Sequence, residues 1–357
     1  MTAPPAPLAP IVPAPAPAPP VDLPEVVVLA LGGTVQAAPG AVAAYPAADP
    51  TGLVVPDAAV PPGLRVRVVA VAPAPSAALD LPDLVALATT ARALVARGAA
   101  GVVVTLGTDM LAEAAFALDL LWPEDLPLVV TAAMRRPGAP GADGPANVRA
   151  ALQVATAPSA RGLGCVVVVN DEVHAAWQVR KGHTSHPGSF RSAQSGPLGW
   201  VAEDRVRIVA APMDRPRVVP EAGAAVPPVA LVPAVLGDDG RTLPGLAGLG
   251  YAGVVVEVAG GGSVPPSWAA PLGHLAGLVP VVYATGCESG ATLLSTYGGP
   301  GAERDLRARG LLPAGVLDGP RARVLLSLLL AAGADRARVR RCLDAFDRPT
   351  HDRGEGA

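Results

Sequence analysis

The sequence predicts an α/β protein with a larger N-terminal domain, built on a mostly parallel sheet covered by helices, and a smaller C-terminal α/β domain. Short β-branched runs alternate with Ala/Leu-rich helical stretches from Val26 onward. The strand runs are apolar throughout, which is typical of strands buried on both faces. A Pro-rich stretch separates two such patterns, and a length of 357 residues fits about two domains.

The elements of the first domain alternate in the order that a parallel sheet requires. The predicted strands are 26–31, 64–71, 101–105, 127–131 and 164–169, and the predicted helices are 83–97, 110–121 and 145–155. Ligands of such sheets bind where the carboxyl ends of the strands meet. We therefore expect the functional side chains in the loops that follow these strands.

The second domain repeats the pattern on a smaller scale. Residues 201–245 are irregular and Pro-rich, and are typical of a hairpin or a linker. After them we expect strands at 254–258 and 279–284, and helices at 266–275, 302–308, 320–331 and 336–346. The expected organisation is a tail (1–24), an N-terminal α/β domain (25–215) that carries the functional loops, a linker (216–245) and a C-terminal α/β domain (246–357).

The N-terminal 24 residues are nearly all proline, alanine and short aliphatic residues. Alternating proline removes backbone donors and favours polyproline II, so we expect a disordered tail. A basic segment followed by a continuous apolar run would indicate a signal peptide, and neither is present here. The sequence thus favours a cytoplasmic location.

Composition argues against several classes of protein. A net charge of −3 and a pI of about 6.0 provide no basic face for nucleic acid. Apolar runs do not reach the ~20 residues of a membrane span. Three widely separated cysteines, Cys165, Cys287 and Cys342, show neither CxxC nor zinc-ligand spacing, so we expect no metal and no cofactor.

Lys181 is the only lysine among the 27 basic residues, since the other 26 are arginine. An amine can give up and regain a proton, whereas a guanidinium in a protein stays charged. The single ammonium therefore indicates a position where permanent charge does not suffice.

Two of the polar motifs follow predicted strands closely. Gly32-Gly33-Thr34 comes directly after 26–31, and Gly107-Thr108-Asp109 follows 101–105. Paired glycines let backbone amides approach a ligand, although a plain tight turn fits the first motif as well. Thr108 or Asp109 before a helix is also a common N-cap.

Two further motifs complete the polar set. Asn170-Asp171-Glu172-Val173-His174 ends the strand 164–169, and Lys181 and His183-Thr184 follow shortly after it. A loop from Met134 to Asn147 leads into the helix 145–155, and we expect its role to be mostly structural.

Together and in this order, these motifs resemble the bacterial L-asparaginase family of threonine amidohydrolases. Leu31-Gly32-Gly33-Thr34-Val35 is similar to the family's T-G-G-T-[IV], and Leu106–Met110 is similar to its H-G-T-D-T. Further matches are Asn170–Ala176 with Lys181, Ala133–Asn147, Ser195–Gly199 and the segment 279–323. The resemblance covers about residues 25–346.

The resemblance implies hydrolysis of the side-chain amide of L-asparagine, and possible action on L-glutamine, through a threonine acyl-enzyme. It implies Thr34 as the nucleophile, a Thr108–Lys181–Asp109 relay, and a lid tyrosine best matched by Tyr45. Substrate binding falls to Ser76, Thr108, Asp109, Gly33 and Ala133. The family completes its site with an acid from a neighbouring subunit, for which Glu303 is the candidate and Tyr297 the competitor, so a homo-oligomer is expected, typically a dimer of dimers.

The chain departs from the family pattern beside the expected site. Leu31, Leu106 and Met110 replace Thr, His and Thr, and Ala77 replaces the Gln that normally follows the serine. These changes leave two alternatives open: a glutaminase or other amide specificity, and a catalytically impaired binding protein on the same fold. A related tRNA-dependent amidotransferase subunit shares the domain, but it usually carries an extra N-terminal module, and the Pro/Ala-rich tail is not expected to be one.

Overall fold

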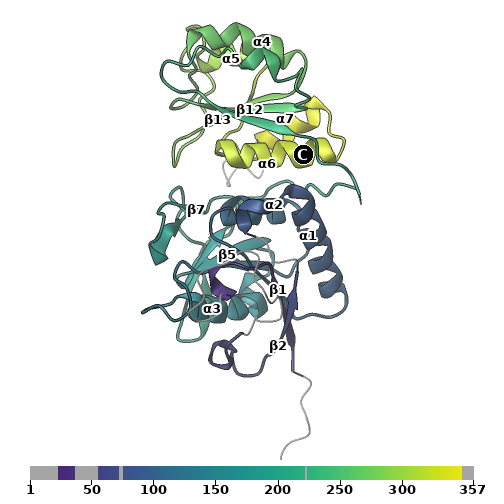
Figure 1. Ribbon diagram of the computed structural model, residues 1–357, viewed down its shortest axis with the longest axis vertical. Helices are drawn as coiled ribbons and strands as arrows, with labels where there is room; N and C mark the ends of the chain where they lie inside the picture. Colours follow the sequence, from purple (N-terminus) through teal and green to yellow (C-terminus); the bar gives the residue numbers. More distant parts are fainter. Residues whose placement is uncertain (1–22, 37–54, 72–74, 222, 348–357) are drawn as a thin grey trace, which may run out of the picture.

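The computed structural model describes residues 23–36, 55–71, 75–221 and 223–347. Within these ranges the chain forms an eight-stranded sheet that ends at residue 208 and a four-stranded sheet that begins at residue 229. The two sheets and their helices lie in the lower and upper halves of Figure 1. The predicted two-domain α/β class is confirmed. Residues 1–22 of the predicted tail lie outside the described residues.

The first sheet has the order β10-β9-β6-β5-β4-β3-β1-β2. Its strands are β1 (Glu25–Ala30), β2 (Arg65–Ala70), β3 (Gly101–Thr105), β4 (Leu128–Thr131), β5 (Cys165–Val169), β6 (Glu172–Ala175), β9 (Gly199–Ala202) and β10 (Arg205–Ile208). The five strands from β2 to β5 pair in parallel, as predicted, and the remaining three pair antiparallel. Strands β3, β4 and β5 are buried along their whole length, which explains their unbroken apolar sequences.

A tight hairpin joins the parallel and antiparallel parts of this sheet. Asn170 and Asp171 lie between β5 and β6 with φ of 53° and 61°. Asn and Asp tolerate this left-handed backbone, which matches the twist of the strands on either side. Farther along the chain, β7 (Arg180–Lys181) pairs with β8 (Phe190–Arg191) in a separate two-stranded ribbon that carries the only lysine.

Three helices accompany the first sheet: α1 (Leu81–Ala96), α2 (Leu111–Leu120) and α3 (Gly144–Thr156). Asp80 and Asp83 form a capping box at the start of α1, each accepting the other's backbone N–H. Helix α2 is almost entirely buried, because it packs against β5 on one side and against a helix of the second domain on the other.

The second sheet is fully parallel, in the order β11-β12-β13-β14. Its elements are β11 (Val229–Pro233), β12 (Gly253–Val258), α4 (Ala269–Ala276), β13 (Val281–Thr285), α5 (Glu303–Ala308), β14 (Leu312–Pro313), α6 (Gly319–Ala331) and α7 (Arg336–Asp344). Strand β11 lies inside residues 216–245, which we expected to be a linker, so the second sheet starts earlier in the chain.

The apolar core is continuous between the two domains. Helix α6 contacts α2 across the boundary (Figure 1), and its buried leucines belong to the same cluster as β1, β3 and β5. Because the domains share this core, the loops of the first domain and the start of α6 keep a fixed relation to each other.

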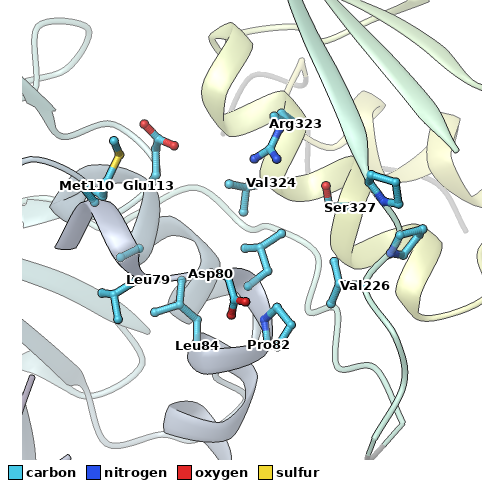
Figure 2. Close-up of a pocket in the computed structure, with 15 residues that line it drawn as sticks. Leu79, Asp80, Pro82, Leu84, Met110, Glu113, Val226, Arg323, Val324 and Ser327 are labelled. Carbon is cyan, nitrogen blue, oxygen red and sulfur yellow. The ribbon is translucent and has the colours of Figure 1, made fainter. Parts of the chain in front are cut away.

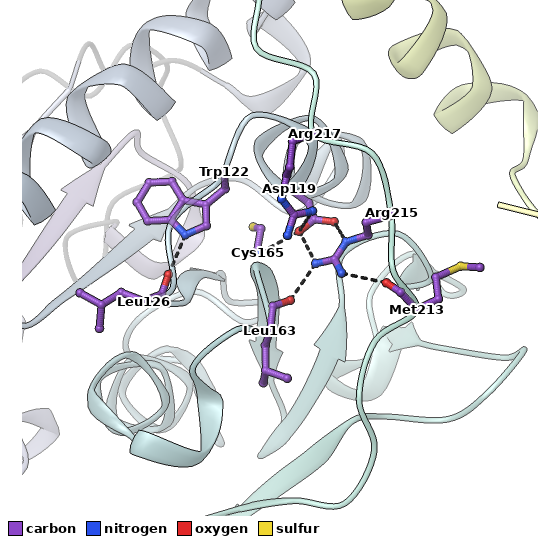
Figure 3. Close-up of polar contacts among 8 residues, drawn as sticks. All are labelled: Asp119, Trp122, Leu126, Leu163, Cys165, Met213, Arg215 and Arg217. Carbon is purple, nitrogen blue, oxygen red and sulfur yellow. Dashed lines mark hydrogen bonds and ion pairs between the residues drawn. The ribbon is translucent and has the colours of Figure 1, made fainter. Parts of the chain in front are cut away.

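A buried ion pair anchors the segment that leaves the first domain (Figure 3). Asp119 of α2 is fully buried and accepts Nη2 of Arg215 at 2.6 Å and the N–H of Cys165 at 2.8 Å. The same guanidinium donates to the carbonyls of Leu163 and Met213. Burial lowers the pKa of Arg215, because it disfavours the charged guanidinium. The carboxylate of Asp119 has the opposite effect and prevails, so the pKa of Arg215 is raised.

Candidate active site

Thr34 follows β1 in a loop whose path depends on glycine. The N–H of Leu31 still pairs with the carbonyl at the end of β3, and the chain then turns at Gly33, which has φ +96°. A Cβ at this position would lie 2.8 Å from the backbone N of Gly107, so only glycine fits. This close approach brings the loop of Thr34 against the loop that carries Thr108.

Lys181 lies between a hydroxyl and a carboxylate. Its Nζ donates to Thr108 Oγ1 at 2.9 Å and to Asp109 Oδ1 at 2.7 Å. The lysine side chain is 18 % exposed, whereas that of Asp109 is 72 % exposed. The structure thus brings together three residues that the resemblance grouped, although more than 70 positions separate the lysine from the other two.

Ser76 lies directly beside this trio. It is buried, and its Oγ accepts the N–H of Met110 at 3.3 Å. A Cβ on Gly107 would lie 2.9 Å from the same oxygen, so the serine packs against both ends of the loop that contains Thr108 and Asp109.

Ala133 follows β4 and lies next to the Thr34 loop. A Cβ built on Gly144 would be 3.5 Å from the Cβ of Ala133 and 3.3 Å from Cγ2 of Val35, so these three residues meet at the start of α3. Thr34 is the chain neighbour of Val35 and begins a single 3₁₀ turn. The loops after β1, β3 and β4 therefore gather at one edge of the sheet.

The loop from Met134 to Asn147 is held by its own polar side chains. Asp143 accepts the N–H groups of Met134 and Arg135 at 2.9 and 2.8 Å. Asn147 donates to the carbonyl of Ala132 at 2.9 Å and accepts the N–H of Asn170 at 2.8 Å. These contacts fix the strand ends of β4 and β5 relative to each other.

The remaining expected site residues, Tyr45, Glu303 and Tyr297, are not among the residues that contact Lys181 in the described part of the chain. Tyr45 lies outside the described residues. Glu303 is fully buried in the second domain, where it accepts the backbone N–H of Tyr297, a residue that is itself 59 % exposed. Oε2 of Glu303 is buried and has no hydrogen-bond partner within the described ranges.

The departures from the family pattern fall into two groups. Leu31 and Leu106 are buried and belong to the hydrophobic core, so their apolar side chains are accommodated by packing. Met110 and Ala77 instead line a cavity between the two domains. Both lie next to Ser76: Ala77 follows it in the chain, and the N–H of Met110 donates to its Oγ.

The sequence alone did not indicate the contacts that hold Lys181 from the second domain. Its neighbour Arg180 forms an ion pair of 2.8 Å with Asp318, the N-cap of α6. Asp318 also pairs with Arg321, whose Nη2 donates to the carbonyl of Val179. The two residues before Lys181, Val179 and Arg180, are thus both tied to the start of α6. No local sequence pattern predicts this long-range contact.

His174 is a structural residue of this region. Its ring is buried on β6 and its Nδ1 lies 3.0 Å from Ser192 Oγ. Burial lowers its pKa to about 4, which keeps the imidazole neutral near pH 7. Among the residues that the structure describes, no three His, Cys, Asp or Glu side chains gather in a way that could hold a metal ion.

Comparisons with known proteins agree on one family. Residues 25–214 match the model for the N-terminal domain of asparaginase, and residues 228–343 match the model for the glutaminase/asparaginase C-terminal domain. The chain is 34 % identical to an L-asparaginase from Bacillus licheniformis over 233 residues, which cover 65 % of this chain and 71 % of the relative. It is 41 % identical over 105 residues to a glutaminase-asparaginase from Acinetobacter glutaminasificans, covering 29 % and 31 % of the two chains.

A solved structure supports the same conclusion. A probable cytoplasmic L-asparaginase from Campylobacter jejuni superposes with a TM-score of 0.79 at 25 % identity, covering 90 % of this chain and all of the other. The fold and the matched regions define a two-domain α/β amidohydrolase. More narrowly, the chain belongs to the asparaginase family, since the two family models together span most of its length.

Proposed function

We propose that the protein hydrolyses the side-chain amide of L-asparagine to L-aspartate and ammonia, with Thr34 as the nucleophile. The observation that carries the proposal is the position of Lys181 Nζ, within hydrogen-bond distance of both Thr108 Oγ1 and Asp109 Oδ1. An unactivated amide resists water, and such a lysine can relay the protons that its cleavage requires.

The first half of the reaction forms an ester. Thr34 Oγ1 attacks the amide carbon while its proton passes to the relay, in which Lys181 starts as a neutral amine, and the backbone amides of the glycine turn at Gly33 would stabilise the developing oxyanion. Collapse of this intermediate breaks the C–N bond, and the relay returns the proton lost by Thr34 to the leaving nitrogen, which departs as ammonia. The acyl group then remains on Thr34.

The second half regenerates the enzyme. Water attacks the ester while Thr108 passes one of its protons to the neutral amine of Lys181. The relay then returns that proton to Thr34 Oγ1 as the ester bond breaks and aspartate is released. Asp109, with its exposed carboxylate, and Ser76 would hold the ammonium and carboxylate of the substrate. Tyr45 would polarise Thr34 from a lid that closes over the substrate.

We further propose that the site is completed in a homo-oligomer, as a dimer of dimers. Glu303, or alternatively Tyr297, would reach the substrate of a neighbouring subunit. Glu303 is fully buried and its Oε2 has no hydrogen-bond partner among the described residues, whereas Tyr297 is 59 % exposed and is the candidate that a neighbouring subunit can reach without rearrangement. A cytoplasmic location is proposed from the likeness to the Campylobacter protein; within the described ranges, every helix is too short or too polar to cross a bilayer.

Two other functions remain open to test. Glutamine hydrolysis is favoured by the local identity to the glutaminase-asparaginase. A binding protein without activity would be favoured by the changes at Met110 and Ala77, which alter the edge of the site, whereas Thr34, Thr108, Asp109 and Lys181 are all retained.

An ammonia-release assay with a panel of amides tests the proposal. We expect turnover of L-asparagine in the wild type, and a loss of about 10²–10⁴-fold in kcat in Lys181→Met and in Lys181→Arg, because neither side chain relays a proton. Both variants should keep the wild-type circular dichroism spectrum. Near-normal turnover in Lys181→Arg would show that positive charge alone suffices and would contradict the proposed proton relay.

A further inference from the structure

A cavity of about 460 Å³ lies between the two domains, beside α2 and α6 (Figure 2). Its size is that of a site for a small molecule. The first domain contributes the start of α1 and the first turn of α2, and the second contributes α6 together with the connection at residues 226–228. The cavity is separate from the Thr108–Asp109–Lys181 trio, none of which lines it.

Two opposite charges line the same end of this cavity without pairing. Figure 2 shows Glu113 on α2 and Arg323 on α6. Among the described residues the carboxylate of Glu113 has no hydrogen-bond or ion-pair partner, and Arg323 uses only its Nε, which donates to the carbonyl of Val229 at 2.9 Å. Burial raises the pKa of Glu113, and Asp318 adds to this while Arg321 and Arg323 oppose it. A partly buried carboxylate and guanidinium thus both remain available to a ligand.

Most of the remaining wall is apolar, and its polar members are Ser327 and Asp80, whose carboxylate accepts the N–H of Asp83 at the start of α1. Leu79 and Leu84 face Val226 and Val324 across the cavity. The apolar part of this surface accommodates a branched aliphatic group of a few carbon atoms. The combination of an acid, a base and an apolar pocket matches one common class of metabolite, the zwitterionic amino acid with an aliphatic side chain.

We propose that this cavity binds a free aliphatic α-amino acid as an effector, with the carboxylate of the ligand on Arg323, its ammonium on Glu113 and its side chain against Leu84 and Val324. Charge-assisted hydrogen bonds to both heads would fix the orientation.

The cavity also reaches the candidate active site through the backbone. Met110 lines it and donates its N–H to Ser76 Oγ, and Ala77 lines it as the next residue after that serine. A ligand that contacts Met110 and Ala77 therefore acts on both chain segments that place Ser76. We expect occupation of the cavity to change the KM for the amide substrate, because a ligand that shifts the position of Ser76 changes the affinity of the active site for that substrate.

Equilibrium dialysis of the full-length protein with L-leucine tests the site. One leucine should bind per chain, saturating L-aspartate should not displace it, and 4-methylpentanoate and 3-methylbutylamine, which each lack one charged head, should bind at least ~10-fold more weakly. Glu113→Gln and Arg323→Gln should each weaken leucine binding by a similar factor. Ser327→Leu, which fills the cavity from α6 and leaves both charges in place, should abolish it.

Three results would overturn the proposal: no leucine binding at millimolar concentration, displacement by L-aspartate, or unchanged affinity in Ser327→Leu with a native circular dichroism spectrum. Because dialysis needs no turnover, failure of leucine to bind says nothing against amide hydrolysis. Equally, an inactive protein that binds leucine keeps this site while losing the proposed function.

Discussion

Lys181 has a chemical property that none of the 26 arginines shares, since its ammonium can lose a proton and take it back. Its Nζ lies 2.9 Å from a hydroxyl and 2.7 Å from a carboxylate, and only 18 % of the side chain is exposed. Shielding from water strengthens both interactions compared with a surface lysine. A single residue thus joins the loop after β3 to the ribbon formed by β7 and β8.

A second residue makes stability depend on pH. The pKa of His174 falls from 6.5 to about 4 because the ring is buried, and Glu172, whose Oε2 lies 3.3 Å from Nε2, does not reverse the effect. The unfolded chain therefore binds a proton between pH 6.5 and about 4 that the folded protein does not. The resulting loss of stability begins near pH 6.5 and is complete below about pH 4, amounting to ~3 kcal/mol.

Urea unfolding between pH 7 and 4 measures this loss. In His174→Gln we expect the pH dependence over this window to be reduced by about that amount, while His274→Gln, which changes an exposed histidine, should follow the wild type. Identical pH profiles for His174→Gln and the wild type would mean that folding leaves the pKa of His174 unchanged, which would contradict this account.

At the scale of elements, the site depends on where strands end and on what holds the last of them. The loops after β1 and β3 meet because Gly33 has no Cβ. A Cβ at this position would lie only 2.8 Å from the backbone N of Gly107. The ribbon β7–β8 is short and is held by α6, through Arg180 to Asp318 and through Arg321 to the carbonyl of Val179. Asp318 is therefore a positioning residue for Lys181.

Asp318→Asn tests this role. Asparagine is also a good N-cap, so α6 keeps its start while both ion pairs are lost. We expect kcat to fall about 10-fold or more as Nζ loses its fixed position, with a smaller change in KM and a shifted pH profile of kcat. Asp318→Glu should recover part of the loss.

The matched control is Asp335→Asn. Asp335 caps α7 in the same way, accepting the N–H of Arg338 at 2.7 Å, and it forms no contact with β7 within the described ranges. Kinetics of both variants separate the two explanations: equal effects would assign Asp318 a purely structural role.

For the molecule as a whole, apolar strands buried on both faces were predictable from sequence, and short or edge elements were not. The runs that became β3, β4 and β5 are continuous and end at polar motifs, so their bounds agree closely with prediction. Strand β11 was assigned to a linker because its sequence, VALVP, lies among prolines, and only pairing with β12 makes it a strand.

The candidate site shows the same division. Thr34, Thr108, Asp109 and Lys181 could be proposed from motifs that resemble a family, and the structure places three of them in direct contact. Asp318, Arg321 and the cavity at Glu113 and Arg323 could not, because each arises where α6 packs onto the first domain. Contacts between residues so far apart in sequence depend on the relative position of the two domains.

The most direct test of the central claim, that Thr34 attacks the substrate in a site activated by Lys181, is mass spectrometry of the protein after reaction with an electrophilic asparagine analogue. We predict one adduct per chain on the peptide that contains Thr34, and none in Thr34→Ala or Lys181→Arg. An adduct located on Thr108, or the absence of any adduct while ammonia is still released from asparagine, would contradict the claim.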